Sequence, residues 1–281
     1  MIIYKHAKDL QEHLQKLKQN ERSIGFVPTM GALHNGHLSL IKQSKLNTDI
    51  TVSSIYVNPV QFNNQDDFKK YPVTLESDIL LLEDFCDILF LPEEEDIYPD
   101  ENSKHKHFEI GDLEKRLEGK YRPGHFQGVC MVVERLLNII EPTHLFLGQK
   151  DYQQSLIIKK LTRLLNKNIA IIISPTVREP NGLAMSSRNL RLNAEEKNRA
   201  ADLYKSLVEM NAKLQLGNNG VLKNEIRYKL EKKGFKIDYL EIAAAGDLEL
   251  IDDVKKSDGL IILAAAYLSN VRLIDNLIVT A

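Results

Sequence analysis

The stretch SIGFVPTMGALHNGHLSL, residues 23–40, predicts the fold of the chain. Its apolar first part, residues 23–27, is typical of a buried strand, which we expect to end at Pro28. A glycine-containing loop follows, and the apolar spacing then predicts a helix over residues 38–46. A strand, a short loop and a helix in this order form the first part of a β–α–β unit.

The same alternation continues through residue 174. Further strands are expected at residues 51–57, 88–91, 144–147 and 169–174, and helices at 75–85, 128–140 and 152–165. This order predicts an α/β fold: a Rossmann-like parallel sheet covered by helices on both faces. In such sheets ligands bind beyond the carboxyl ends of the strands, where the strand order reverses.

The last third of the chain has a different pattern. Residues 175–189, PTVREPNGLAMSSRN, are rich in turn-forming residues and predict a loop. Helices at 194–216 and 221–232 and strands at 238–242, 260–266 and 271–279 are expected after it. We therefore predict two domains, a Rossmann-like domain over residues 1–175 and a smaller α+β domain over residues 176–281.

Composition and charge exclude several classes of function. The chain has 281 residues, is 43% hydrophobic and 27% charged, and has a formal charge of −2, so nucleic acid is not an expected partner. Its two cysteines, Cys86 and Cys130, lie in apolar stretches, which fits thiols in a reducing cytoplasm. The N-terminus has no signal-peptide pattern and the apolar runs are too short to span a bilayer, so we expect a cytoplasmic protein without a membrane partner.

The pair His34 and His37 is the main candidate for a functional site. A spacing of three places both side chains on one face of a first helical turn, where free N–H groups and the helix dipole favour phosphate. Gly31 and Gly36 allow the backbone to approach a nucleotide closely. The pair could instead bind zinc, although no third ligand has a recognisable spacing, or consist of ordinary surface histidines. The strand–loop–helix context favours the nucleotide.

A second candidate is Met185-Ser186-Ser187-Arg188, in the loop between the two predicted domains. Two hydroxyls and a permanent positive charge can donate hydrogen bonds to phosphate oxygens. The alternative is that a serine caps a following helix.

Two further candidates follow predicted strands. After residue 147, Lys150 could neutralise phosphate, Asp151 could cap the next helix or contact a ribose, and Gln154 could present its amide to a substrate. The alternative for this segment is an ordinary capped helix with a solvated lysine. After residue 57, Gln61 could recognise a hydroxyl or a carboxylate.

The turn RPGHF, residues 122–126, carries Arg122 and His125 in front of a predicted helix. It either clamps an anion or is a simple turn.

As an ordered set these segments resemble the pantothenate synthetase (pantoate–β-alanine ligase) family of the nucleotidyltransferase superfamily. The segments that carry the resemblance are PTMGALHNGHLSL, RPGHF, GQKDYQQ, VREPNGLAMSSRN and RLIDN. The chain departs slightly from the family pattern, because Asn35 and Gln149 replace acidic residues and Met185 stands where leucine is common.

The resemblance implies that the carboxylate of pantoate attacks the α-phosphorus of ATP to give pantoyl adenylate and pyrophosphate. The amine of β-alanine then attacks the acyl carbon, releasing AMP and pantothenate. Mg²⁺ would accompany ATP, no other metal is implied, and the family's usual form is a homodimer.

The resemblance also implies roles for individual residues. His34, His37 and Lys150 would act on the phosphates, with His37 as the proton donor, and Ser186, Ser187 and Arg188 would close on the triphosphate. Gln61 and Gln154 would hold pantoate, and Gln61 also β-alanine. The implied ATP-binding set is Met30, Gly31, Ala32, Leu33, His34, Asn35, Gly36, His37, Gly148, Gln149, Lys150, Asp151, Val177, Met185, Ser186, Ser187 and Arg188.

Two other functions remain open from the residues alone. One is a nucleotidyltransferase acting on another, phosphorylated small substrate; the neutral amides of Gln61 and Gln154 argue against it, since phosphate would favour more arginine or lysine. The other is a nucleotide-sensing module without catalysis. A tRNA-charging role is not expected, because no anticodon-sized basic domain follows residue 189.

Overall fold

The computed structural model of the chain describes residues 1–254 and 259–279. A six-stranded, fully parallel sheet forms its first part, in the order β1-β4-β3-β2-β5-β6. The strands are β1 (Ile2–Tyr4), β2 (Ile24–Thr29), β3 (Ile50–Ile55), β4 (Ile88–Phe90), β5 (His144–Gly148) and β6 (Ala170–Ser174). The predicted Rossmann-like architecture is confirmed, and the strand order reverses between β2 and β5.

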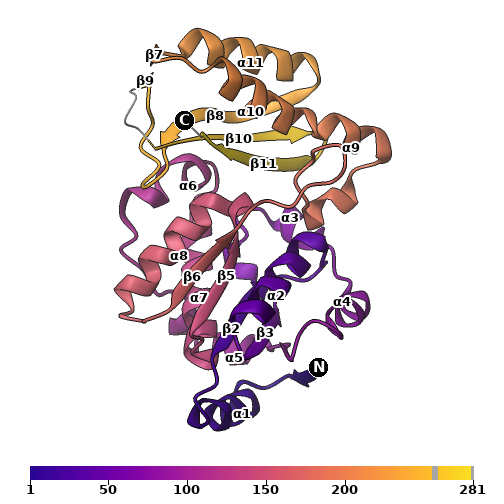
Figure 1. Cartoon of the computed structure of the whole chain (residues 1–281), viewed down its shortest axis with the longest axis vertical. Helices are drawn as coiled ribbons and strands as arrows, with labels where there is room; N and C mark the ends of the chain where they lie inside the picture. The colour runs from indigo at the N-terminus through magenta and orange to yellow at the C-terminus, as the bar shows by residue number, and fades with distance from the viewer. Residues whose placement is uncertain (255–258, 280–281) are drawn as a thin grey trace.

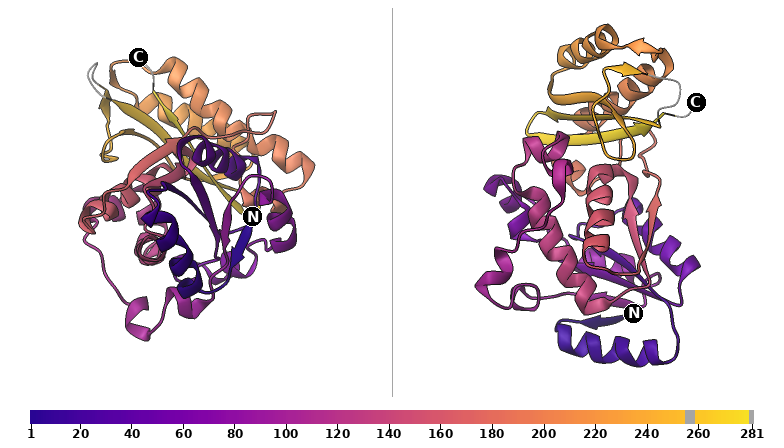
Figure 2. Two further views of the ribbon diagram at one scale, coloured as in Figure 1. Left: turned by 60° about the horizontal axis from the view of Figure 1, so that its bottom comes forward. Right: turned by 90° about the vertical axis from the view of Figure 1, so that its left-hand side faces the viewer.

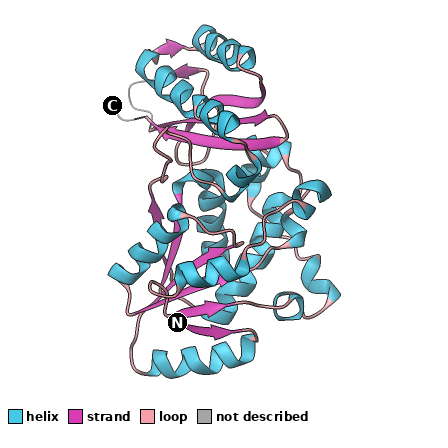
Figure 3. Cartoon of the chain, turned by 90° about the vertical axis from the view of Figure 1, so that its right-hand side faces the viewer, coloured by secondary structure: helices cyan, strands magenta, loops and turns pink. Residues whose placement is uncertain are grey.

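Helices cover both faces of this sheet (Figure 3). The helices of this part are α1 (Ala7–Gln19), α2 (Asn35–Asn47), α3 (Gln65–Lys69), α4 (Leu75–Leu82), α5 (Glu94–Ile97), α6 (Leu117–Tyr121), α7 (His125–Ile140) and α8 (Tyr152–Leu164). Two of them lie away from the parallel sheet: α3 has no buried residue, and Leu117 of α6 packs with the C-terminal sheet. Neighbouring side chains of one strand point to opposite faces. Phe26 therefore packs with α1, α7 and α8, whereas Val27 packs with α2 and α4.

Strand β2 continues through Pro28, so the prediction that Pro28 ends it is wrong. The N–H and C=O groups of Ile24 form hydrogen bonds with Thr143, on the β5 side of β2. The backbone groups of alternate residues in a strand face the same side, so those of Pro28, four residues later, also face β5. Of the residues of β2, only Gly25 and Phe26 pair with β5. Proline lacks an N–H group, and at this position it interrupts no bond between strands.

Three other sequence predictions need correction. Strand β1 was not expected and pairs with β4 at the edge of the sheet. Helices α2 and α7 begin three residues earlier than predicted, at Asn35 and His125. The helix predicted over residues 194–216 is two helices that meet at Ala201, whose ψ of −19 tightens the backbone there, with Ala200 and Ala201 fully buried.

The C-terminal part contains a three-stranded antiparallel sheet in the order β11-β10-β8 and a two-stranded sheet of β7 and β9. Its elements are α9 (Ala194–Ala200), α10 (Asp202–Lys213), β7 (Gly217–Asn218), α11 (Gly220–Lys232), β8 (Phe235–Ala244), β9 (Asp253–Val254), β10 (Leu260–Leu268) and β11 (Val271–Ile278). The sheet lies between helices α10 and α11 and the end of the first part (Figures 1 and 2).

Strand β11 contacts the segment that directly follows β5. The second sheet therefore closes over the end of the parallel sheet where the strand order reverses. The predicted boundary at residues 175/176 stays a prediction, and residues 255–258 and 280–281 of the second predicted domain lie outside the described residues. Among the described residues, no helix has both the length and the apolar character that a membrane span requires.

Candidate functional site

A cavity opens at the carboxyl ends of β2 and β5, under the loop that leads to the C-terminal part. Many of the residues predicted for the site line it: Met30, His34, Gly36, His37, Gln61, Gly148, Lys150, Asp151, Gln154, Val177, Met185, Ser186, Ser187 and Arg188. Gly31, Ala32, Leu33, Asn35 and Gln149 were predicted with them but do not line this cavity. The structure therefore brings together residues that are up to 158 positions apart, from Met30 to Arg188.

The two histidines stand together at the start of α2. His34 is the residue before the first helical turn, and its Nδ1 accepts a hydrogen bond from the N–H of Gly36 at 3.1 Å. The Nδ1 of His37 accepts from the N–H of His34 at 3.3 Å, and the ring centroids are 4.0 Å apart. Because each Nδ1 accepts, the proton of each neutral ring must be on Nε2.

Both imidazoles are held neutral. Burial, followed by the charge of Lys150, lowers the pKa of His34 to about 4. Burial, followed by the electrostatic effects of the neighbouring His34 and Lys150, holds the pKa of His37 well below its ordinary value. At neutral pH each ring therefore has one N–H group to donate and no charge of its own.

The loop before the histidines is held by a carboxylate that sequence reasoning missed. Buried Asp78, in α4, accepts hydrogen bonds from the N–H groups of Ala32 at 2.9 Å and Leu33 at 2.8 Å. Gly31 has φ +78, and a Cβ there would lie 3.0 Å from this carboxylate, so the position requires glycine. Gly31, Ala32 and Leu33 therefore shape the loop and do not line the cavity.

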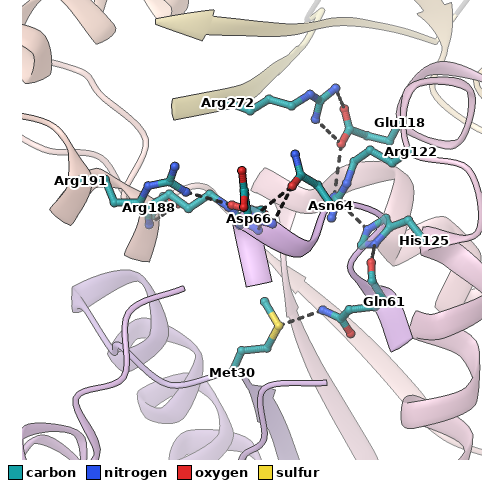
Figure 4. A network of polar contacts seen from close by, with 12 residues as sticks. Met30, Gln61, Asn64, Asp66, Glu118, Arg122, His125, Arg188, Arg191 and Arg272 are labelled. Carbon is teal, nitrogen blue, oxygen red and sulfur yellow. Dashed lines mark hydrogen bonds and ion pairs between the residues drawn. The ribbon is translucent and has the colours of Figure 1, made fainter. Parts of the chain in front are cut away.

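Gln61 lies at the end of the short 3₁₀ helix η1 (Pro59–Gln61) and is buried. Its Nε2 contacts the Sδ of Met30 at 2.8 Å (Figure 4). Its Oε1 accepts a hydrogen bond from Asn58 Nδ2 at 3.2 Å. Asn58 in turn accepts from the hydroxyl of Tyr98 at 2.7 Å. Asn58 directly follows a predicted strand, so its position was a usable signal for a role in orienting Gln61.

The segment after β5 begins with η4 (Gln149–Asp151). Asp151 makes no side-chain bond to the start of α8, so the interpretation as a helix cap is wrong; its carboxylate lies 3.7 Å from Lys150 Nζ instead. Gln149 points away from the cavity, because its amide donates to Asn276 Oδ1 at 3.1 Å. Asn276 also donates to the carbonyls of Gln149 and Lys150, which fixes η4 to β11.

The loop at residues 175–189 is tied to both parts of the molecule. Arg178 forms two hydrogen bonds with the buried carboxylate of Asp275, at 2.7 and 2.9 Å. Ser186 accepts from the N–H of Arg188 at 3.3 Å and so caps η5 (Ser187–Arg191), which confirms the capping interpretation. The hydroxyl of Ser187 donates to the carbonyl of Ala32 at 2.9 Å, which joins this loop to the loop before the histidines.

The described residues contain no group of three or more His, Cys, Asp or Glu side chains that could hold a metal ion. The His34–His37 pair therefore lacks the further protein ligands that a structural zinc site uses.

The family model described as pantoate-beta-alanine ligase matches residues 2–278. The chain belongs to the pantoate–β-alanine ligase family. A pantothenate synthetase from Cytophaga hutchinsonii is 45% identical over 99% of both chains. As a member of this family, the enzyme condenses pantoate with β-alanine in an ATP-dependent reaction.

Two solved structures of the pantoate–β-alanine ligase family share the whole architecture. The pantothenate synthetase from Thermus thermophilus has a TM-score of 0.87 and 35% identity, with 100% of both chains covered. The ligase from Francisella tularensis, a complex with β,γ-ATP and β-alanine, has a TM-score of 0.84 and 40% identity, covering 99% of this chain and 97% of that one. The resemblance stated from the sequence motifs is confirmed.

Proposed function

We propose that the cavity at the ends of β2 and β5 performs this condensation in two steps. A carboxylate oxygen of pantoate attacks the α-phosphorus of ATP and displaces pyrophosphate, and the amine of β-alanine then attacks the acyl carbon of pantoyl adenylate and displaces AMP. The supporting observation is that two imidazole N–H donors, a lysine and two neutral amides line one cavity. The Francisella tularensis ligase, in its complex with β,γ-ATP and β-alanine, supports binding of both substrates.

The histidines and Lys150 act on the phosphates. The transition state for attack at phosphorus gains negative charge on its oxygens, and donors already in place stabilise it without rearrangement. His34 and His37 are neutral, and they contribute as Nε2–H hydrogen-bond donors while Lys150 supplies the positive charge. His37 is the residue to which the family resemblance assigns proton donation, and as a neutral ring it contributes here by donating its Nε2–H hydrogen bond to a phosphate oxygen.

Gln61 and Gln154 hold pantoate, and Gln61 also holds β-alanine. An amide can donate to a carboxylate and accept from a hydroxyl at the same time, which suits a hydroxy acid. The Nε2 of Gln61 donates to the thioether of Met30, which is a weak acceptor. A pantoate oxygen is a better acceptor and would replace it.

The remaining cavity residues surround ATP. Gly148, Asp151, Val177 and Met185 line the nucleotide side, and Ser186, Ser187 and Arg188 close the triphosphate side. Gly31, Ala32, Leu33 and Asn35 lie between β2 and the first turn of α2, Gln149 lies after β5, and all five support the site from outside the cavity. Exclusion of water by these loops would protect the acyl adenylate from hydrolysis.

Magnesium enters as part of the MgATP substrate. Mg²⁺ keeps several waters and is usually held by phosphate oxygens together with one or two carboxylates. Asp151, which lines the cavity beside Lys150, is the candidate carboxylate. We also propose a homodimer, a cytoplasmic location and a functional boundary at residues 175/176, on the family resemblance and the sequence pattern.

Product analysis tests the two-step reaction. With pantoate, β-alanine and MgATP, AMP and pyrophosphate should form in equal amounts, and ADP as the product would contradict the proposal. Without β-alanine, one pyrophosphate per active site should form and the reaction should then stop. Continuous pyrophosphate release without any amine would instead indicate a nucleotidyltransferase acting on another substrate.

A further inference from the structure

The turn at residues 122–125, just before α7, contacts the main chain of Gln61. The Nδ1 of His125 lies 2.8 Å from the carbonyl oxygen of Gln61. A carbonyl oxygen only accepts, so Nδ1 must carry a proton. The Nε2 of the same ring lies 3.0 Å from Nη1 of Arg122, and arginine only donates, so Nε2 must be the acceptor.

This arrangement fixes the tautomer of His125. The ring is buried, 5% exposed, and is neutral with its proton on Nδ1. His34 and His37, in the neighbouring cavity, have the opposite tautomer. Burial and then the charge of Arg122 lower the pKa of His125 to about 3, so the ring stays neutral over the physiological range.

We propose that His125 and Arg122 are positioning residues for the reaction: Arg122 fixes the His125 ring so that it holds the main chain of Gln61, and thereby the substrate amide of Gln61, in place. The proposal rests on the proposed role of Gln61 in holding pantoate. Neither residue lines the cavity that contains Gln61, although Arg122 lines an adjoining cavity with Lys150 and Arg188. The proposal therefore gives His125 no contact with substrate.

The surrounding packing shows that the main chain of Gln61 is held closely. A Cβ added to Gly128, in the first turn of α7, would lie 2.5 Å from the Cα of Gln61 and 2.6 Å from the carbonyl oxygen of Val60. Asn58 also donates to the carbonyl of Gly128 at 3.0 Å. Helix α7 therefore abuts η1 directly, and the bond from His125 sets where along the helix Gln61 sits.

The same chain of bonds reaches the C-terminal part (Figure 4). The carboxylate of Glu118 lies 3.6 Å from Arg122 and accepts two hydrogen bonds from Arg272, in β11, at 2.7 and 2.8 Å. Arg272 also donates to Asp238, in β8, at 2.7 Å. Strands β8 and β11 are thus connected to His125 through Arg272, Glu118 and Arg122.

A pair of substitutions at one position tests the proposal. His125→Leu removes the donor to Gln61 at similar volume, whereas His125→Asn places an amide N–H near the position of Nδ1. We expect His125→Leu to lower kcat/KM for pantoate by about 100-fold, the effect of a displacement of about 1 Å in a positioning residue. His125→Asn should recover about tenfold of that loss, while the KM for ATP stays the same in both.

His13→Leu is the matched control, because His13 lies in α1, away from the cavity, and its hydrogen bond is to Tyr4 of β1. It should leave all three substrate constants unchanged. Equal activity of His125→Leu and His125→Asn would overturn the proposal, and so would a parallel increase in the KM for ATP, since either would indicate a general structural effect.

A double substitution separates this inference from the proposed role of Gln61. If His125 acts through Gln61, Gln61→Leu combined with His125→Leu should be no worse than Gln61→Leu alone. Additive losses would overturn the coupling but leave the role of Gln61 intact. A normal KM for pantoate in Gln61→Leu would instead overturn that role, and this inference with it.

A spectrum of the unaltered protein remains informative even where a variant does not fold. Nitrogen NMR of histidine-labelled protein distinguishes the two tautomers. We expect the Nδ1–H form for His125 and the Nε2–H form for His34 and His37 at neutral pH. An Nε2–H form or a charged ring at His125 would overturn the proposal.

Discussion

The carboxylate of Asp67 holds the guanidinium of Arg188 at the edge of the candidate active site. Its Oδ2 lies 2.7 Å from Nη2 and its Oδ1 lies 3.3 Å from Nε, and Oδ1 also accepts from Arg191 at 2.9 Å. Burial opposes ionisation of Asp67, but the hydrogen bonds and charge of Arg188, with the charges of Arg122 and Arg191, outweigh it and lower its pKa. The Asp67 carboxylate therefore fixes the orientation of the Arg188 guanidinium.

This contact predicts how the loop that carries Arg188 moves. Asp67→Asn removes the charge that ties α3 to η5 (Ser187–Arg191), so hydrogen exchange at the amides of η5 should become faster. MgATP should slow it again, because phosphate oxygens replace the carboxylate as partners of Arg188. Hydrogen–deuterium exchange with mass spectrometry measures both effects.

Asp66→Asn is the control for this experiment, because Asp66 is the exposed neighbour on the same helix. Unchanged exchange at η5 in Asp67→Asn would show that Asp67 does not hold the loop.

Buried Glu118 predicts the acid stability of the enzyme. Burial alone would raise the pKa of this carboxyl, but the hydrogen bonds and charge of Arg272 and the charge of Arg122 lower it to about 2. Because the folded pKa is below the unfolded one, this stability is present above about pH 4.5 and is lost as the pH falls toward 2. The shift corresponds to about 3 kcal/mol in the free energy of unfolding.

Denaturant titrations of wild type and Glu118→Gln between pH 7 and pH 2.5 test this. The variant should be less stable at pH 7, since Arg272 and Arg122 lose their buried counter-charge, and the difference should shrink as the pH falls. Glu225→Gln, which removes an exposed partner of Lys213 and Lys229, should change little. A difference that stays constant down to pH 2.5 would refute the assignment.

Substitution by leucine should affect stability at Gln153 and substrate binding at the adjacent Gln154. Gln153 is buried, accepts from the N–H of Glu118 at 3.0 Å and donates to the carbonyls of Leu113 and Arg116 at 2.6 and 2.8 Å. Gln153→Leu should therefore lower the melting temperature, because those buried groups lose their partner.

Gln154, by contrast, lines the cavity. Gln154→Leu should raise the KM for pantoate about 5- to 10-fold, the effect of one hydrogen bond, with little change in melting temperature or in the KM for ATP. Steady-state kinetics and thermal melting of the two variants provide the comparison. A normal KM for pantoate in Gln154→Leu would remove this residue from the substrate site.

The fold and much of the cavity lining could be predicted because they depend on local patterns. Short apolar runs, such as residues 23–27 and 144–147, placed the strands, although β2 runs on through Pro28. The carboxyl ends of parallel strands meet at one edge of the sheet. The residues that follow those strands, such as His34 and Lys150, therefore converge in the cavity.

What the sequence did not reveal are contacts between distant segments. Asp78 accepts a hydrogen bond from Ala32, in the loop before His34, although the two residues are 46 positions apart in the sequence. Asp67 and Arg188 form their ion pair across 121 positions. Neither carboxylate has a local pattern that distinguishes it from a solvated acidic residue. The function of the 122–125 turn was open for the same reason, since its partners are Gln61, Glu118 and, through Glu118, Arg272.

The central claim is that His37 donates a hydrogen bond to the phosphates of ATP. Pyrophosphate release in the first half-reaction tests it most directly. Wild type and His37→Ala are mixed with pantoate and MgATP, without β-alanine, and pyrophosphate is followed over a single turnover. We expect His37→Ala to be slower by about 10²- to 10³-fold, the effect of losing one donor to a transition-state oxyanion. Release at close to the wild-type rate, with a normal melting temperature, would contradict the assignment of this site.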